Sequence, residues 1–170
     1  SLGGTVLSES VRVAGDEIND SIATYLKKVH NLVVGERTAE EIKIKIGSAF
    51  PSNEFDLQSI DVRGLHLLSG LPRSINLKAG DLREAMSEPL NKIVDAVKRT
   101  LERTPPELAA DIVDRGIMLA GGGALVRGIS DLLSHETGIF THVAEDPLLC
   151  VVNGCGLVLD DFKSMRRVLD

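Results

Sequence analysis

The chain has 170 residues, of which 43% are hydrophobic and 26% charged, proportions typical of one globular domain or of two small lobes that share a core. Its net charge is -6 and its aromatic content only 3%, so it lacks both the positive charge that attracts phosphate backbones and the rings that stack on bases. These numbers argue against disorder and against a nucleic-acid partner.

The sequence contains no signal for a membrane or for secretion. No apolar run approaches the roughly 18 residues of a membrane span, and the first residues do not follow a signal-peptide pattern. The two cysteines, Cys150 and Cys155, lie in an apolar stretch, which predicts buried reduced thiols rather than a disulfide. We therefore expect a cytoplasmic protein.

The first part of the chain predicts a strand, a helix and a segment of mixed character. Residues 5–13 follow the turn pair Gly3-Gly4 and are rich in β-branched residues, as in a β-hairpin, and helical spacing then predicts a helix over about 16–31. The segment 38–47 alternates like a strand but opens with Thr38-Ala39-Glu40-Glu41, a helix capping box. We predict a short helix there.

The middle of the chain predicts two strands and the longest helix. The strands cover 55–62 and 65–77, broken by Gly64, Gly70 and Pro72. An apolar stripe predicts a long helix over 82–103, with Asp81 as its cap and Pro105-Pro106 as its end. Pro89 lies inside this helix and should either kink it or end its first turn.

The last part predicts short elements around a run of three glycines. A short helix over 107–113 precedes an apolar run, 116–120, of the kind found in buried parallel strands. After Gly121-Gly122-Gly123 we expect a further helix, a strand and two terminal helices, over 124–138, 139–143, 147–159 and 162–169.

The strand, glycine run and helix form the strongest local signal in the sequence. Glycines let a backbone approach a ligand closely, and the N-terminus of the following helix offers free N–H groups to a polar or anionic ligand. A tight strand-to-helix turn without a ligand would use the same residues. The pattern alone leaves both interpretations open.

A dinucleotide site is the first enzyme hypothesis, because Glu145-Asp146 follows the second strand, where a ribose-binding acid belongs. The fingerprint needs a third glycine at position 126, where Val126 stands. The sequence also has no Walker loop, no Gly-x-Ser-x-Gly elbow and no Cys or His cluster at metal spacing. We interpret the four histidines as surface or structural residues, namely His30, His66, His135 and His142.

A second candidate lies on the predicted helix 38–47. Glu40 and Lys43 are three residues apart, so they share one face and could bind a ligand or form a weak surface ion pair. Spacing does not decide between the two.

Three segments carry a family resemblance: GERTAEEIKIKIGSAFP, SEPLNKIVDAVKRTLERTPPELAADIVDRGIMLAGGGALVRGISDLLSHETGI and VAEDPLLCVVNGCG. Together they closely resemble the C-terminal half of the MreB family, the bacterial actin-like proteins that determine rod shape. The match extends from the first residue to about Leu159. It settles the conflict in 38–47 in favour of a helix.

The resemblance implies an α/β fold: one lobe of an actin-like, ribonuclease H-like ATPase, with a mixed sheet flanked by helices and a smaller inserted α+β subdomain. Residues 1–14 and 79–170 would form the inner subdomain and 15–78 the outer one. The cofactor implied is ATP, with Mg²⁺ in the full-length protein. Two segments match the family's nucleotide-binding motifs, so the implied ATP-binding residues are Glu40, Glu41, Ile42, Lys43, Gly121, Gly122, Gly123, Ala124 and Leu125.

The function implied is that of an ATP-binding subunit of a filament that organises cell-wall synthesis, with partners that include further subunits and membrane proteins such as RodZ. Such filaments lie under the membrane, although this chain would not touch it directly. The family's other lobe and both phosphate loops are absent from the sequence, and Ala14-Gly15-Asp16 departs from its Gly-Gly-Asp. We therefore assign no catalytic residue or metal ligand and expect no ATPase activity from this chain alone.

Two alternatives remain at this stage. A chaperone-type actin-like ATPase has a similar Gly-Gly motif before a helix, and would need a substrate-binding domain beyond residue 170. An NAD-dependent oxidoreductase is the weaker alternative, because Val126 stands where the dinucleotide fingerprint needs a glycine.

Overall fold

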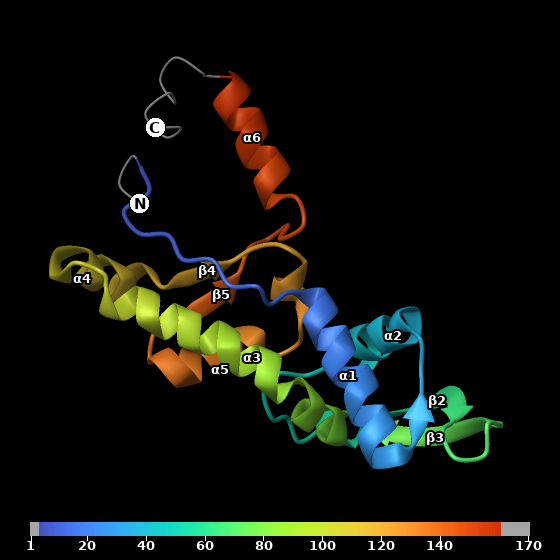
Figure 1. The fold of residues 1–170 in the computed structure, drawn as a ribbon. Coiled ribbons are helices and arrows are strands. Elements are labelled where there is room, and N and C mark those ends of the chain that lie inside the picture. Colours follow the sequence, from blue (N-terminus) through green and yellow to red (C-terminus); the bar gives the residue numbers. More distant parts are fainter. Residues whose placement is uncertain (1–3, 161–170) are drawn as a thin grey trace.

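A computed structural model describes residues 4–160 (Figure 1). The elements of its first part are α1 (Gly15–His30), β1 (Leu32–Val33), α2 (Glu36–Ile46), the 3-10 turn η1 (Phe55–Leu57), β2 (Ser59–His66), β3 (Pro72–Lys78) and α3 (Ala79–Glu102). Those of its second part are α4 (Pro106–Arg115), β4 (Ile117–Leu119), the 3-10 turn η2 (Gly122–Leu125), α5 (Ile129–Thr137), β5 (Thr141–Val143) and α6 (Cys150–Asp160).

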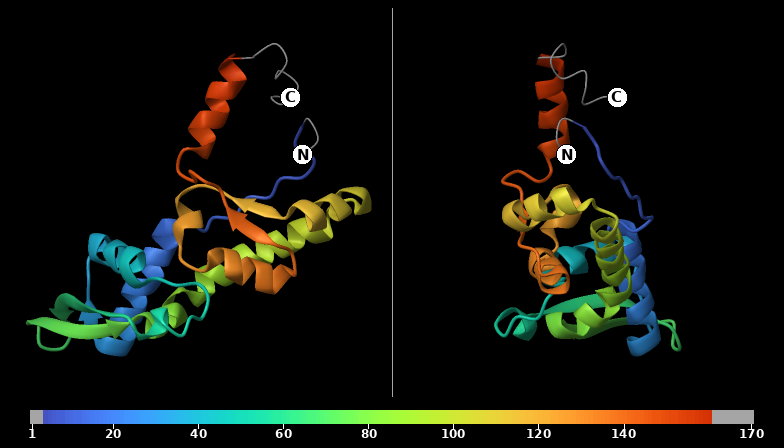
Figure 2. Two further views of the ribbon diagram at one scale, coloured as in Figure 1. Left: turned by 180° about the vertical axis from the view of Figure 1, so that it is seen from behind. Right: turned by 90° about the vertical axis from the view of Figure 1, so that its left-hand side faces the viewer.

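The long helix α3 connects the two parts of the molecule. The hairpin of β2 and β3 lies at one end and α4 at the opposite end, in the view of Figure 1 and from behind in Figure 2. Helix α6 stands apart from the other elements in all views. The molecule is therefore elongated along α3.

The first sheet is antiparallel with the order β1-β2-β3. Strand β3 pairs with β2 over its whole length, from Lys78 opposite Ser59 to Pro72 opposite Leu65. The predicted break at Gly64 is wrong, because Gly64 pairs with Arg73 inside the ladder. The predicted start of the strand is also wrong, because residues 55–57 form η1. A side chain at position 64 would collide with β1, which explains why a glycine continues this strand.

The core forms between α1, α2, α3 and the inner face of this sheet. Ile22, Leu26, Leu82 and Met86 have no exposed surface, since the apolar stripes of α1 and α3 face each other. The cluster extends to α5 through Ile129 and Leu133. This packing explains why the first part folds around aliphatic residues without disulfides.

The predicted helices of the first part are confirmed, with corrections at their starts. Helix α2 begins at Glu36 after Gly35, so the capping box predicted at Thr38 is wrong. Helix α3 begins at Ala79 after Lys78 rather than at an Asp81 cap, and it continues through the buried Pro89. Burial of the apolar stripe outweighs the hydrogen bond that the proline ring removes.

The second sheet has two parallel strands, β4 and β5, with Met118 opposite His142. This confirms the predicted parallel pairing, but the strand is not buried, since Met118 is 64% exposed. The predicted helix 124–138 is wrong in its first turns. Residues Gly122–Leu125 form η2, and Gly128, with a φ of 72°, separates it from α5.

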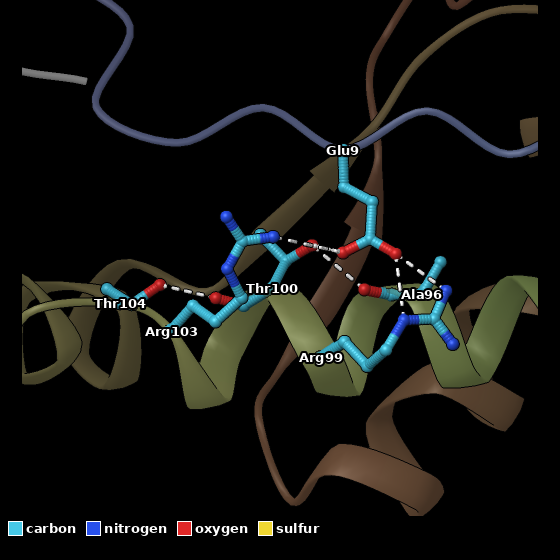
Figure 3. Close-up of polar contacts among 6 residues, drawn as sticks. All are labelled: Glu9, Ala96, Arg99, Thr100, Arg103 and Thr104. Carbon is cyan, nitrogen blue, oxygen red and sulfur yellow. Dashed lines mark hydrogen bonds and ion pairs between the residues drawn. The ribbon is translucent and has the colours of Figure 1, made fainter.

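The segment before α1 does not form the predicted strand. Residues 4–13 are irregular, because a strand needs a partner for its backbone groups and no described segment pairs with this one. Glu9 holds the segment against α3 instead: its carboxylate accepts hydrogen bonds of 2.9 and 2.6 Å from Arg99 and one of 3.4 Å from Thr100 (Figure 3).

Three smaller expectations have different outcomes. The cysteines are free but not buried, since Cys150 is half-buried and Cys155 exposed. Among the described residues no helix is long and apolar enough to cross a membrane. The helix predicted over 162–169 lies outside the described residues.

Candidate functional site

The glycine run forms a sharp turn after β4. Gly121 has a φ of 82°, which a side chain would strain, and its N–H donates to the Pro147 carbonyl at 2.7 Å. The Ala124 N–H returns to the Gly121 carbonyl at 3.1 Å, which closes the 3-10 turn. Gly121 is therefore a glycine for conformational reasons.

The next two glycines have no such reason within the described chain. A Cβ at Gly122 would make only an ordinary contact, 3.7 Å from Leu148 Cδ2, and a Cβ at Gly123 would meet nothing within 4 Å. Both residues are exposed and neither has a positive φ. Their missing side chains leave open space beside the backbone, which a ligand can enter.

Helix α2 presents its predicted residues on different faces. Glu40 and Glu41 are exposed, and within residues 4–160 Glu41 forms an ion pair only with Arg37 one turn earlier, at 3.4 Å. Ile42 is 2% exposed and belongs to the core, as does the 7% exposed Ala124 of the glycine turn. These two side chains pack inside the molecule, so only their backbone could face a ligand.

Lys43 connects α2 to the start of α1. Its Nζ donates to the Gly15 carbonyl at 3.1 Å rather than pairing with Glu40. At the same helix start the Ala14 N–H donates to the Glu17 carboxylate at 2.7 Å, and this bond holds the pKa of Glu17 below its ordinary value. Lys43 and Gly15 are thus neighbours although far apart in sequence.

The two predicted segments are tied together just beyond their ends. The Ala49 N–H donates to the Arg127 carbonyl at 2.8 Å, and Ser48 and Arg127 form a parallel bridge. Ala49 follows α2 by three residues, and Arg127 follows η2 by two. The structure therefore brings the end of α2 beside the segment after the glycine turn.

Sequence reasoning missed the residues of this tie. Gly128 has a positive φ, and a Cβ there would press against Phe50 at 3.0 Å, so the close approach requires a glycine. The Arg127 guanidinium lies 3.7 Å above the Phe55 ring, beside a cavity of about 260 Å³ that the predicted residues do not line. The sequence did contain one signal for this turn, because a glycine stands directly before the helical pattern at 129–133.

The residues fit a nucleoside better than a metal ion. The open space at Gly122 and Gly123 suits a flat group that passes close to backbone, and the exposed carboxylates of α2 can accept hydrogen bonds from hydroxyl or amino groups. Within residues 4–160 no group of three or more His, Cys, Asp or Glu side chains could hold a metal ion. We assign no role to a metal in this chain.

Comparison with solved structures defines the class of protein. The chain superimposes on MreB5 of Spiroplasma citri bound to AMPPNP with a TM-score of 0.90 and 36% identity, covering 96% of this chain and 48% of that one. The ADP-bound MreB5 gives a TM-score of 0.88. A MamK double helical filament shares only the fold, with a TM-score of 0.76 at 17% identity. The chain therefore has the actin-like fold that the sequence predicted.

Comparison of sequences defines the family. The model described as MreB/Mbl protein matches residues 1–167. The cell shape-determining protein Mbl of Bacillus subtilis is 44% identical over 167 residues, and MreB of Escherichia coli is 49% identical over 160. The chain belongs to the MreB/Mbl family. The matches include 98% and 94% of this chain but only 50% and 46% of the two relatives. The chain therefore spans about half the length of these relatives.

Proposed function

We propose that this chain forms the adenosine-binding half of an ATP-dependent actin-like subunit. The observation that supports this most directly is the pair of glycines, Gly122 and Gly123, which no contact or strained φ within the described chain requires. Its similarity to an AMPPNP-bound relative supports a nucleotide as the ligand. In this proposal residues 15–78 are the outer subdomain, and residues 1–14 and 79–170 the inner one.

The predicted residues other than the buried Ile42 and Ala124 each have a definite task in this proposal. Gly121 sets the turn, while Gly122 and Gly123 let the backbone run beside the nucleoside. Leu125, which is 57% exposed, offers an apolar contact, and Glu40, Glu41 and Lys43 supply polar groups from α2. Bound ATP, with Mg²⁺, would supply the phosphate chemistry, and the groups for hydrolysis would come from outside this chain.

The cellular role proposed is that of a filament subunit that organises cell-wall synthesis under the membrane. Its partners would be further subunits and membrane-bound elongation proteins such as RodZ. Family membership supports this role, because the curated relatives are cell shape-determining proteins. No observation favours the chaperone-type ATPase or the oxidoreductase.

Two lysines of α2 provide a matched test of the nucleotide site. Lys43 and Lys45 lie about 200° apart around the helix, since each residue adds about 100°. In a complete two-lobed subunit that contains this chain, Lys43→Ala should weaken ATP binding and Lys45→Ala should not. Titration with a fluorescent ATP analogue measures both, and equal effects would contradict the proposal.

The glycine turn provides a second test. Gly122→Val in the same subunit should leave the fold intact, because the site has room for a side chain, yet should weaken ATP binding by a few kcal/mol through steric exclusion. A folded variant with unchanged ATP affinity would refute the assignment. The 170-residue chain alone should release no phosphate from ATP, because hydrolysis needs groups placed by both lobes.

A further inference from the structure

A cavity of about 260 Å³ lies where the segment after α2 meets the segment after the glycine turn. Its walls come from residues between Ser48 and Gln58 on one side and from Arg127, Gly128 and Asp131 on the other. None of the predicted ATP-binding residues lines it. Pockets for drug-sized molecules begin at about 300 Å³, so this cavity suits a smaller ligand.

The walls of the cavity are held by contacts of their own. The Ser48 Oγ donates to the Phe50 carbonyl at 2.8 Å, and the Ala49 N–H donates to the Arg127 carbonyl at 2.8 Å. The Phe50 ring packs against the His135 ring of α5, with 5.6 Å between the ring centroids. These contacts fix the walls before a ligand binds, so binding would spend little free energy on ordering them.

The cavity contains a positive charge whose position is fixed. The half-buried Arg127 holds its guanidinium 3.7 Å from the centroid of the Phe55 ring, and Phe55 is only 4% exposed. This cation–π contact restrains the plane of the guanidinium. Within residues 4–160 the guanidinium forms no ion pair. A fixed, planar set of N–H donors without an acidic partner is suited to a carboxylate, which it can bind through two parallel hydrogen bonds.

Two carboxylates line the same cavity without pairing with this charge. Glu54 and Asp131 are exposed, and in the part of the chain that the structure describes neither forms an ion pair. A simple anion at Arg127 would be repelled by the two carboxylates, and a simple cation beside them would be repelled by the guanidinium. A small molecule that carries both charges finds a partner for each.

We propose that this cavity binds a free α-amino acid with a small aliphatic side chain. The carboxylate of the ligand accepts hydrogen bonds from Arg127, and its ammonium group donates to Glu54 and Asp131. Its side chain lies against Phe50 and Pro51, the apolar part of the wall. The site is separate from the residues proposed to bind ATP, so the proposal goes beyond the proposed function and does not depend on it.

The test titrates L-valine into a complete two-lobed subunit that contains this chain and follows NMR chemical shifts. Binding should saturate with a Kd of about 1 mM or tighter, and the shifts should centre on Gly128 and Phe50. Two blocked forms of the probe each lack one charge: N-acetyl-L-valine has no ammonium group, and L-valinamide has no carboxylate. Each should bind at least about tenfold more weakly, because one charged partner in the cavity is left unmatched.

Variants of the cavity test which group meets which charge. Arg127→Gln should weaken valine binding by about tenfold or more and should make valine and valinamide bind alike, because the partner of the carboxylate is gone. The double variant of Glu54→Gln and Asp131→Asn should make valine and N-acetylvaline bind alike for the same reason. Both acidic residues are exposed, so this variant keeps the proposal testable if circular dichroism shows that Arg127→Gln disturbs the fold.

Matched controls change one charge of each sign outside the cavity. Arg37, whose side chain is 93% exposed on α2, and Glu107, exposed on α4, do not line it. Arg37→Ala and Glu107→Gln should leave the affinity for valine within about twofold of wild type. Saturating ATP should not displace valine, since the two proposed sites share no residue.

Several outcomes would overturn the proposal. They are the absence of saturable valine binding, equal binding of valine and its blocked forms to the wild-type subunit, cavity variants that bind valine as the controls do, and displacement of valine by ATP. A subunit that binds ATP but not valine would leave the proposed function intact while this site fails. Valine binding without ATP binding would give the opposite result, so the two failures are distinguishable.

Discussion

Residues 15–103 and residues 104–160 place their apolar side chains in opposite ways. In the first region helices α1, α2 and α3 bury their stripes together, and every member of the core cluster except Ile129 and Leu133 lies between Ile18 and Val94. In the second, α4 and α6 bury no residue at all. The first region therefore has a core of its own, whereas the second presents apolar side chains that its described neighbours leave uncovered.

The largest difference between the regions should appear in core truncations. Leu82→Ala on α3, at a fully buried site, should lower the free energy of unfolding by about 2–5 kcal/mol, because it removes buried methyl groups and leaves a cavity. Leu159→Ala on α6, 73% exposed, should change it by less than about 0.5 kcal/mol. Urea denaturation measures both. A comparable loss at Leu159 would show that α6 is covered in solution.

A smaller effect should separate two glycines of the second region. Gly116 and Gly121 share a positive φ, but a Cβ at Gly116 would also collide with the carbonyl of Phe140, the residue before β5, while one at Gly121 meets nothing within 4 Å. Gly116→Ala should cost about 2 kcal/mol or more and Gly121→Ala about 1 kcal/mol. Hydrogen exchange should locate the loss in β4 and β5 and spare β2. Faster exchange throughout the chain would mean that the regions unfold together.

The contact that joins the N-terminal segment to α3 should contribute less. A double-mutant cycle with Glu9→Gln and Arg99→Ala should give a coupling energy of about 0.5–1 kcal/mol, since the Glu9 carboxylate is mostly shielded and accepts two hydrogen bonds from Arg99. The exposed pair of Glu88 and Lys92 on α3 is the control, with about 0.3–0.5 kcal/mol expected. Zero coupling for the first pair would show that the segment is not held to α3 by this carboxylate.

The smallest effect should be a pH dependence at the start of α1. The hydrogen bond from Ala14 lowers the pKa of Glu17 in the folded chain, so its stabilisation is present above the unfolded pKa and is lost as pH falls through the folded one. Glu17→Gln should therefore lower the melting temperature slightly at neutral pH. At a pH well below about 4.3, where the glutamate is protonated in both states, the substitution should have no effect. A difference that persists in acid would point to another cause.

The sequence predicted most of the first region because helical periodicity and a local core agree there. The stripes from Ile18 to Val29 and from Leu82 to Leu101 gave α1 and α3 to within a few residues. Where residues depend on a distant partner, local pattern misled. Residues 5–13 have strand composition but pair with no described strand, and Gly128 has a positive φ and lies so close to Phe50 that a Cβ there would be 3.0 Å from it.

The candidate site shows the same division. Its glycines and the exposed carboxylates of α2 carry local signals, so they could be named in advance. That Lys43 meets Gly15, and that Arg127 meets Ala49, depends on packing between distant segments, which spacing along one helix does not encode. The division into subdomains and the ligand contacts themselves remain predictions.

The hydrogen bond between Ala49 and Arg127 has a consequence for how a ligand would be received. Both Ala49 and Ser48 are buried, so breaking this bond would leave a donor without water and cost about 1–3 kcal/mol. This bond therefore restrains the segment after α2 against the segment after the glycine turn. If a nucleotide binds between these segments, as we propose, little free energy would be spent on ordering them. A molecule of a different size would have to break the hydrogen bond between Ala49 and Arg127 to move the segments apart.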